Sequence, residues 1–166
     1  EKGGLISKGR SNALAWVKHW TDAVTLRVAD RVAEIVGLPR NNAESFQVIN
    51  YGPDQEYRAH YDAFSIDTAR GKRCMAKGGQ RLVTTLLYFN DVEEGGATSF
   101  PHLDGVAVTP KVGRMLLFHN CPEGTTDVHP KSLHHGEPVI RGEKWAANLW
   151  FRAEAIQRPP KTKFRR

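Results

Sequence analysis

Apolar positions near the start of the chain recur with the spacing of an α-helix. In residues 21–39, "TDAVTLRVADRVAEIVGLP", apolar side chains at positions 24, 28, 32, 35 and 36 form one stripe. Thr21 or Asp22 can cap the start of this helix, and Gly37 followed by Pro39 marks its end. We expect a helix that braces a sheet.

The pattern then changes to short runs rich in β-branched and aromatic residues. Five such runs are separated by Gly, Pro, Asn and Asp, and they span residues 45–51, 81–89, 105–110, 113–120 and 144–152. Short strands at close spacing predict a sandwich or barrel. The fold class is therefore expected to be mainly β, with one or two helices at the N-terminal end. No repeat or internal boundary is visible, so we expect one domain over residues 1–156.

Composition adds little to this picture, but the distribution of charge does. The chain has 40% hydrophobic and 25% charged residues and a net charge of +6. Residues 157–166 carry five basic residues and no acid, and we expect them to form a disordered tail. The rest of the chain has a net charge of only +1, which argues against a nucleic-acid partner.

Compartment and redox state are less constrained by the sequence. No apolar run reaches the roughly 20 residues that span a bilayer, so no membrane segment is expected. The chain begins without an initiator methionine or a signal peptide, which leaves targeting open. Cys74 and Cys121 are too few for a disulfide framework, and we expect two free thiols.

The first candidate chemistry is the pair His60 and Asp62 in "EYRAHYDAF", residues 56–64. Residues i and i+2 of a strand project from the same face, so this imidazole and carboxylate can converge on one ligand. An exposed polar pair is the commoner meaning of such a spacing. A facial site for non-haem iron needs two imidazoles and one carboxylate, so a second histidine from a distant segment would be required.

Residues 132–150, "SLHHGEPVIRGEKWAANLW", supply two histidines before a Gly/Pro turn and a strand that begins at Lys144. A lysine buried in an apolar strand without a partner would be costly. A ligand that chelates iron through one end and carries a second carboxylate at the other would provide that partner. The alternative is a lysine whose ammonium group reaches solvent at the start of the strand.

Taken together, these motifs resemble the iron(II)- and 2-oxoglutarate-dependent dioxygenases, and more narrowly the prolyl 4-hydroxylase catalytic domain of the collagen, plant and algal type. The matching segments are "YGPDQEYRAHYD" (51–62), "GGQRLVTTLLYFN" (78–90), "EGGATSFP" (94–101), "LLFHN" (116–120) and residues 132–150. Each segment is weak evidence alone, but all of them in order, over about residues 7 to 152, are highly specific. The resemblance implies a double-stranded β-helix, or jelly roll, with flanking N-terminal helices.

The resemblance also implies roles for individual residues. His60, Asp62 and His134 match the iron ligands, and His134 is preferred to His135 because it lies four residues before Pro138 and ten before Lys144. Lys144 matches the residue that binds the distal carboxylate of 2-oxoglutarate. Tyr51 and Thr98 match positions that line this cosubstrate, with Tyr88 on the same wall, and Arg81, Tyr57 and Trp150 match positions near the substrate peptide. For Tyr88, Thr98 and Trp150 the alternative is packing in the core. Glu137 departs from the family pattern, which has Cys there.

The implied activity is hydroxylation of prolyl residues in a proline-containing peptide or protein to 4-hydroxyproline. It would use Fe(II), 2-oxoglutarate, O2 and ascorbate, and would release succinate and CO2. Asp62 favours hydroxylation, because related halogenases lack this carboxylate. One alternative is a hydroxylase of a free amino acid such as proline, which a closed, charged pocket would favour; an open aromatic groove favours a peptide. A second is a non-catalytic jelly-roll binding module, which would have no use for the full set of site residues. Nucleic-acid demethylation is disfavoured by the near-neutral body and by a lysine, not an arginine, as cosubstrate anchor.

The segment directly after Asp62 has no regular pattern. Residues 65–80, "SIDTARGKRCMAKGGQ", contain four basic residues and three glycines. A loop of this length in a compact domain is usually functional or mobile. We expect either a lid over the site or a surface hairpin.

Overall fold

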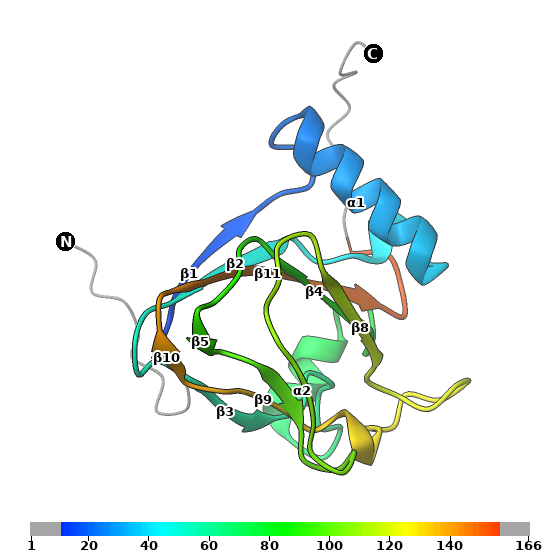
Figure 1. Ribbon diagram of the computed structural model, residues 1–166. Helices are drawn as coiled ribbons and strands as arrows, with labels where there is room; N and C mark the ends of the chain where they lie inside the picture. The colour runs from blue at the N-terminus through cyan, green and yellow to red at the C-terminus, as the bar shows by residue number, and fades with distance from the viewer. Residues whose placement is uncertain (1–10, 157–166) are drawn as a thin grey trace, which may run out of the picture.

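Antiparallel β-sheet dominates the computed structural model, which describes residues 11–156 (Figure 1). The predicted basic tail, 157–166, lies outside the described residues. The strands are β1 (Ala13–Val17), β2 (Phe46–Tyr51), β3 (Tyr57–His60), β4 (Arg81–Tyr88), β5 (Glu94–Gly95), β6 (Thr98–Phe100), β7 (Val106–Val108), β8 (Met115–His119), β9 (His134–Gly136), β10 (Val139–Arg141) and β11 (Lys144–Arg152). The helices are α1 (Ala23–Val36), α2 (Ala69–Met75) and the 3-10 turns Arg40–Asn42 and Pro130–Ser132.

The strands form a larger and a smaller sheet that face each other as a jelly roll. The larger sheet has the order β1-β2-β11-β4-β8, and the smaller has the order β3-β9-β6-β7. The short pair β10-β5 lies beside them (Figure 1). This arrangement confirms the predicted mainly β, jelly-roll fold with a flanking N-terminal helix.

Helix α1 covers the outer face of the larger sheet (Figure 1). Asp22 caps its start in a capping box with Thr25, and Gly37 ends it with φ of 74°, a left-handed conformation that favours glycine. These are the boundaries that the sequence predicts. The buried residues of the helix pack on the outward side chains of the sheet, including Phe46, Leu149 and Phe151.

Side chains alternate between the two faces of β11, so this strand contributes both to the core under α1 and to the interior of the jelly roll. Ala147, Leu149 and Phe151 belong to the cluster under α1, whereas Ala146 belongs to the cluster between the two sheets. Because side chains alternate along a strand, Lys144 shares the inward face with Ala146. The first residue of the last strand therefore places a lysine in the interior of the jelly roll.

Residues 65–80 are not an irregular loop or a hairpin, because they contain helix α2. That the segment acts as a lid over the site stays a prediction. Thr68 caps this helix, and Gln80 exchanges two hydrogen bonds with the backbone of Phe64 at 2.7 and 2.9 Å. Arg152, at the end of β11, donates to the carbonyl oxygens of Cys74 and Lys77 at 2.5 and 2.6 Å. Arg152 thus docks the segment on the body from a position distant in sequence.

Gly71 of α2 allows this docking. A Cβ atom at Gly71 would overlap the backbone carbonyl of Ser65, so Gly71→Ala is expected to displace α2, at a cost typical of overpacking, about 1–3 kcal/mol. Limited trypsin cleavage within α2 should accelerate severalfold. Gly52→Ala is the control, since its Cβ would meet only the side-chain oxygen of Gln55 at 3.9 Å. Equal cleavage rates in both variants would show that α2 tolerates the added methyl group.

Two smaller expectations are also tested by the structure. Cys74 and Cys121 are free, as predicted. None of the helices in residues 11–156 is long and apolar enough to cross a membrane.

Candidate active site

Three of the predicted residues converge between the two sheets. His60 ends β3 and His134 begins β9, and the two residues pair directly across these antiparallel strands. Asp62 Oδ1 lies 3.6 Å from His60 Nε2, and Asp62 Oδ2 lies 3.6 Å from His134 Nε2. The candidate ligand atoms of this group all lie within 4.8 Å of one another.

Asp62 does not reach this group in the way that the His-x-Asp spacing suggests. Strand β3 ends at His60, and Asp62 lies in the bend that follows. The prediction that both residues belong to one strand is therefore wrong, although their side chains do converge. The bend brings the carboxylate back toward His134 on the neighbouring strand.

Hydrogen bonds to the backbone orient both imidazoles. Nδ1 of His60 lies 2.8 Å from the carbonyl oxygen of Arg58, and Nδ1 of His134 lies 3.0 Å from that of Ser132. Each Nδ1 therefore donates its proton, which leaves the lone pair of Nε2 directed at the shared site. The ring of Tyr57 stacks on His60 with a centroid distance of 3.7 Å.

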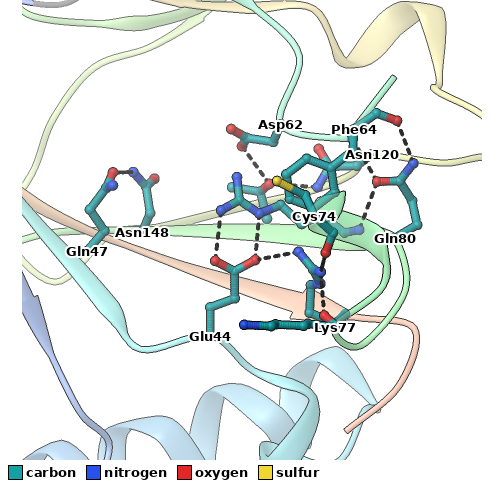
Figure 2. Close-up of polar contacts among 12 residues, drawn as sticks. Glu44, Gln47, Asp62, Phe64, Cys74, Lys77, Gln80, Asn120 and Asn148 are labelled. Atoms are coloured by element: carbon teal, nitrogen blue, oxygen red, sulfur yellow. Dashed lines mark hydrogen bonds and ion pairs between the residues drawn. The ribbon is translucent and has the colours of Figure 1, made fainter. Parts of the chain in front are cut away.

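Asp62 is held by a chain of buried polar groups. Its Oδ2 accepts a hydrogen bond of 2.7 Å from the hydroxyl of Thr84, which in turn accepts one of 2.8 Å from Asn120 (Figure 2). Burial by itself would raise the pKa of Asp62, but the imidazoles of His134 and His60 hold it below its usual range. Burial lowers the pKa of His134. A carboxylate beside a neutral imidazole is the protonation state that a divalent metal requires.

A substitution at Thr84 tests whether its hydrogen bond to Asp62 contributes to metal binding. Thr84→Val removes the hydroxyl while keeping the shape of the side chain, so metal affinity is expected to fall by about 10- to 100-fold. Calorimetric titration with Fe(II) or Mn(II) measures this loss. Thr85→Val is the matched control, because the hydroxyl of Thr85 donates to the carbonyl of Leu149 instead. Equal metal affinity in the two variants would contradict a role for Thr84.

His135 lies outside the cluster. Its Nε2 is 3.4 Å from a carboxylate oxygen of Glu56. The structure thus brings His134, and not its neighbour, to His60 and Asp62.

Lys144 enters the same interior from β11. Its side chain is 3% exposed, and its ammonium group donates to the carbonyl oxygen of Gly96 at 2.7 Å. Burial lowers the pKa of Lys144 to about 8, an effect that Glu137 partly opposes. No carboxylate in the described part of the chain lies within 4.0 Å of this ammonium group. A buried cation in this state is a site for an anion.

A narrow cavity connects Lys144 with the cluster. Its walls include Tyr51, Thr98 and all three residues of the cluster. The ammonium group of Lys144 lies 5.5 Å from the ring centres of both Tyr51 and Tyr88. Tyr88 stands behind the cavity wall, where its hydroxyl donates to Thr98 at 2.9 Å. The structure therefore places Tyr51 and Thr98 at the cavity and Tyr88 as the support of Thr98.

A second, wider cavity also reaches the cluster and shares Tyr57, His60 and Asp62 with the first. This outer cleft, of about 400 Å³, is lined by His60 and Asp62 together with the predicted residues Tyr57, Arg81 and Trp150. Three further aromatic side chains line it, namely Trp16, Tyr61 and Phe64. His60 and Asp62 thus line both a narrow cavity that contains a buried cation and an aromatic cleft.

Arg81 is fixed at the base of the outer cleft. Its guanidinium lies 3.8 Å from the ring centre of Trp150 and forms two hydrogen bonds to Glu44, at 2.7 and 2.8 Å. Glu44 also accepts from Arg152 at 3.1 Å, and Figure 2 shows this carboxylate between the two guanidinium groups. The planar pairing holds Arg81 flat against Trp150.

A register shift between β4 and β11 sends Arg81 into the cleft. Phe151 pairs with Val83 but Arg152 pairs with Arg81, so β4 has one extra residue at this point. Leu82 packs against the core under α1, whereas Arg81 lines the cleft. A bulge of this kind re-aims one side chain.

Glu44, Thr84 and Trp16 are among the residues of this site that sequence reasoning did not assign. Thr84 lies within the segment "GGQRLVTTLLYFN", so its position in a matching motif was an available signal. Glu44 and Trp16 carry no such local signal. Glu44 acquires its role by pairing with residues 37 and 108 positions away.

Comparisons with known proteins agree with this geometry. Residues 46–152 match the model of the 2OG-Fe(II) oxygenase superfamily. Prolyl 4-hydroxylase 2 of Arabidopsis thaliana is 32% identical over 173 residues, covering 92% of this chain and 56% of that protein. Prolyl 4-hydroxylase 5 of the same plant is 33% identical, with 90% and 55% covered. The chain thus spans about half the length of these curated relatives.

Solved structures show the same fold. A viral collagen prolyl hydroxylase from Paramecium bursaria Chlorella virus-1, crystallised as a 2OG complex, superposes with a TM-score of 0.75 at 32% identity, covering 90% of this chain and 83% of that one. A Pseudomonas putida prolyl-4-hydroxylase superposes with a TM-score of 0.60 at 20% identity, covering 88% and 74%. The second match, at its low identity, bears on the fold alone.

Proposed function

Because the chain belongs to the 2OG-Fe(II) oxygenase superfamily, we propose that it hydroxylates prolyl residues of a peptide or protein to 4-hydroxyproline, with Fe(II), 2-oxoglutarate and O2 as reactants and succinate and CO2 as products. The observation that carries the proposal is the pairing of two features in one cavity. A His-Asp-His cluster and a buried ammonium group that lacks a carboxylate partner within 4.0 Å among residues 11–156 both line it. The named relatives are prolyl hydroxylases.

The residues present fit the metal and the cosubstrate. Two free Nε2 atoms and one carboxylate are the donor set of a facial iron site, and they leave the opposite positions open. Fe(II) with 2-oxoglutarate supplies the oxidising chemistry that adds one oxygen atom to a C–H bond. His60, Asp62 and His134 would hold the metal, with ascorbate keeping it reduced.

The remaining residues of the narrow cavity would position the cosubstrate. Lys144 would pair with the distal carboxylate of 2-oxoglutarate. This contact would compensate for the desolvation of its buried ammonium group. Tyr51 and the hydroxyl of Thr98 would contact the chain of the cosubstrate, while Tyr88 holds Thr98 in place.

The outer cleft would hold the substrate. Tyr57, Arg81 and Trp150 line it beside the metal ligands, and Glu44 keeps Arg81 in position. An open cleft with five aromatic side chains supports a peptide substrate over a free amino acid, which would need groups that pair with both of its termini. A binding module would need neither the metal ligands nor Lys144.

Mass spectrometry tests the proposal and separates its alternatives. The protein is incubated with Fe(II), ascorbate and 2-oxoglutarate, and with either proline-containing peptides or free proline. We expect a mass gain of one oxygen on prolyl residues of a peptide. A gain on free proline alone would favour the amino-acid hydroxylase, and no gain on either substrate with metal and cosubstrate bound would favour a binding module.

A further inference from the structure

The rim of the outer cleft on the α2 side is basic. Arg70 lines the cleft, and Lys72, Arg73 and Lys77 follow it on α2 and just beyond. All four side chains are exposed. Across the described residues, no carboxylate lies within 4.0 Å of their charged groups. Asp67 is the one acid in residues 65–80.

These charges are held in place by the docking of α2. Thr68 caps the helix, Gly71 packs against Ser65, and Arg152 binds two carbonyl oxygens of the segment. Arg70, between the cap and the packed glycine, therefore has a backbone fixed at the edge of the cleft. The fixed backbone limits the positions that the guanidinium of Arg70 can reach to the edge of the cleft.

Among the described residues that line the cleft, no unpaired carboxylate offsets the positive charge of this rim. Asp62 is the single carboxylate among the described lining residues, and its two oxygens face His60, His134 and Thr84. Glu44, behind the lining, is paired with both Arg81 and Arg152. Arg70 is therefore the exposed charged residue among the described lining of the cleft, and its positive charge favours an acidic ligand.

We propose that the cleft selects peptides with an Asp or Glu close to the target proline, the carboxylate pairing with Arg70. This inference rests on the proposed prolyl hydroxylation and adds a charge preference to it. A cleft of this size has a width on the order of 7–10 Å, so Arg70 reaches a residue about two or three positions from the proline at the metal. Lys72, Arg73 and Lys77 would add long-range attraction only.

A matched peptide series measures the preference. Three peptides differ at one position, two residues from a single proline, where they carry Asp, Asn or Lys. Each is tested with the Fe(II)-loaded enzyme for kcat/KM, by hydroxyproline formation, and for Kd, by fluorescence anisotropy with 2-oxoglutarate and without oxygen. In one set of peptides the variable residue lies on the N-terminal side of the proline, and in a second set it lies on the C-terminal side. Arg70→Glu is compared with Arg31→Glu, an equal charge reversal at an exposed position of α1, on the far side of the larger sheet (Figure 1).

The wild-type protein and Arg31→Glu are expected to bind the Asp peptide about fivefold more tightly than the Asn peptide, as for one exposed ion pair. Arg70→Glu should reverse the order and favour the Lys peptide, and about 0.5 M salt should reduce both preferences. Equal Kd for all peptides in the wild-type protein, or an equal loss for all of them in Arg70→Glu, would overturn the inference. Hydroxylation without any charge preference leaves the proposed function standing, whereas charge-dependent binding without hydroxylation removes the proposed function alone.

Discussion

Asp62→Ala and His134→Ala are each expected to abolish hydroxylation and to remove measurable Fe(II) binding. The cluster has three candidate ligands, all within 4.8 Å of one another, and the described residues offer no fourth group in it. Loss of Asp62 also leaves two imidazoles without the anion that neutralises the bound metal. Metal affinity by calorimetry and hydroxyproline by mass spectrometry measure the two effects separately.

His135→Ala is the matched control for this experiment. His135 is the neighbour of His134 in sequence, but its imidazole faces Glu56 and lies outside the cluster. This variant should keep its metal and most of its activity. An inactive His135→Ala beside an active His134→Ala would show that the distal ligand has been assigned to the wrong residue.

Lys144→Met is expected to raise the 2-oxoglutarate requirement by roughly 10- to 150-fold while Fe(II) binding stays nearly unchanged. The reason is the loss of a charge-assisted contact to a buried carboxylate, worth about 1.5–3 kcal/mol. Methionine keeps most of the volume of the buried side chain, so the variant tests charge and not packing. Steady-state kinetics at varied 2-oxoglutarate, with metal affinity measured in parallel, give the result. An unchanged requirement would place the cosubstrate elsewhere.

The same lysine predicts a dependence on pH. Burial lowers the pKa of Lys144 to about 8 in the free protein, so the ammonium form predominates below this value and is lost as the pH rises through it. Affinity for 2-oxoglutarate should therefore be level below about pH 7 and should fall between about pH 8 and 9.5. Lys144→Arg should move this fall to higher pH, because a guanidinium stays charged. A level affinity across this range in the wild-type protein would contradict the assignment.

The helices show which local signals the sequence carries. An apolar stripe and two caps defined α1, and the structure has the same caps. Helix α2, "ARGKRCM", has no apolar stripe and was not predicted as a helix. It is held by Arg152, which reaches the carbonyl oxygen of Cys74 from the end of β11. A seven-residue helix that depends on such contacts cannot be inferred from its own residues.

The strands likewise differ in how well their own residues predict them. Long, apolar β4 and β11 were predictable, whereas β5 and β9, of two and three residues, are too short to show an alternation. The ligand set could still be predicted, because five motifs in order fix which residues belong together. The pairing of Glu44 with Arg81 could not, because it requires a bulge between β4 and β11 as well as contacts across the fold.

One site is expected to couple 2-oxoglutarate breakdown to hydroxylation of a peptidyl proline. The most direct measurement counts succinate and 4-hydroxyproline in the same reaction, with the modified carbon located by NMR. We expect one succinate for each hydroxyl group on C4 of proline, and neither product with Asp62→Ala. Succinate formed without hydroxyproline at saturating peptide, or oxygen added to another residue, would contradict it.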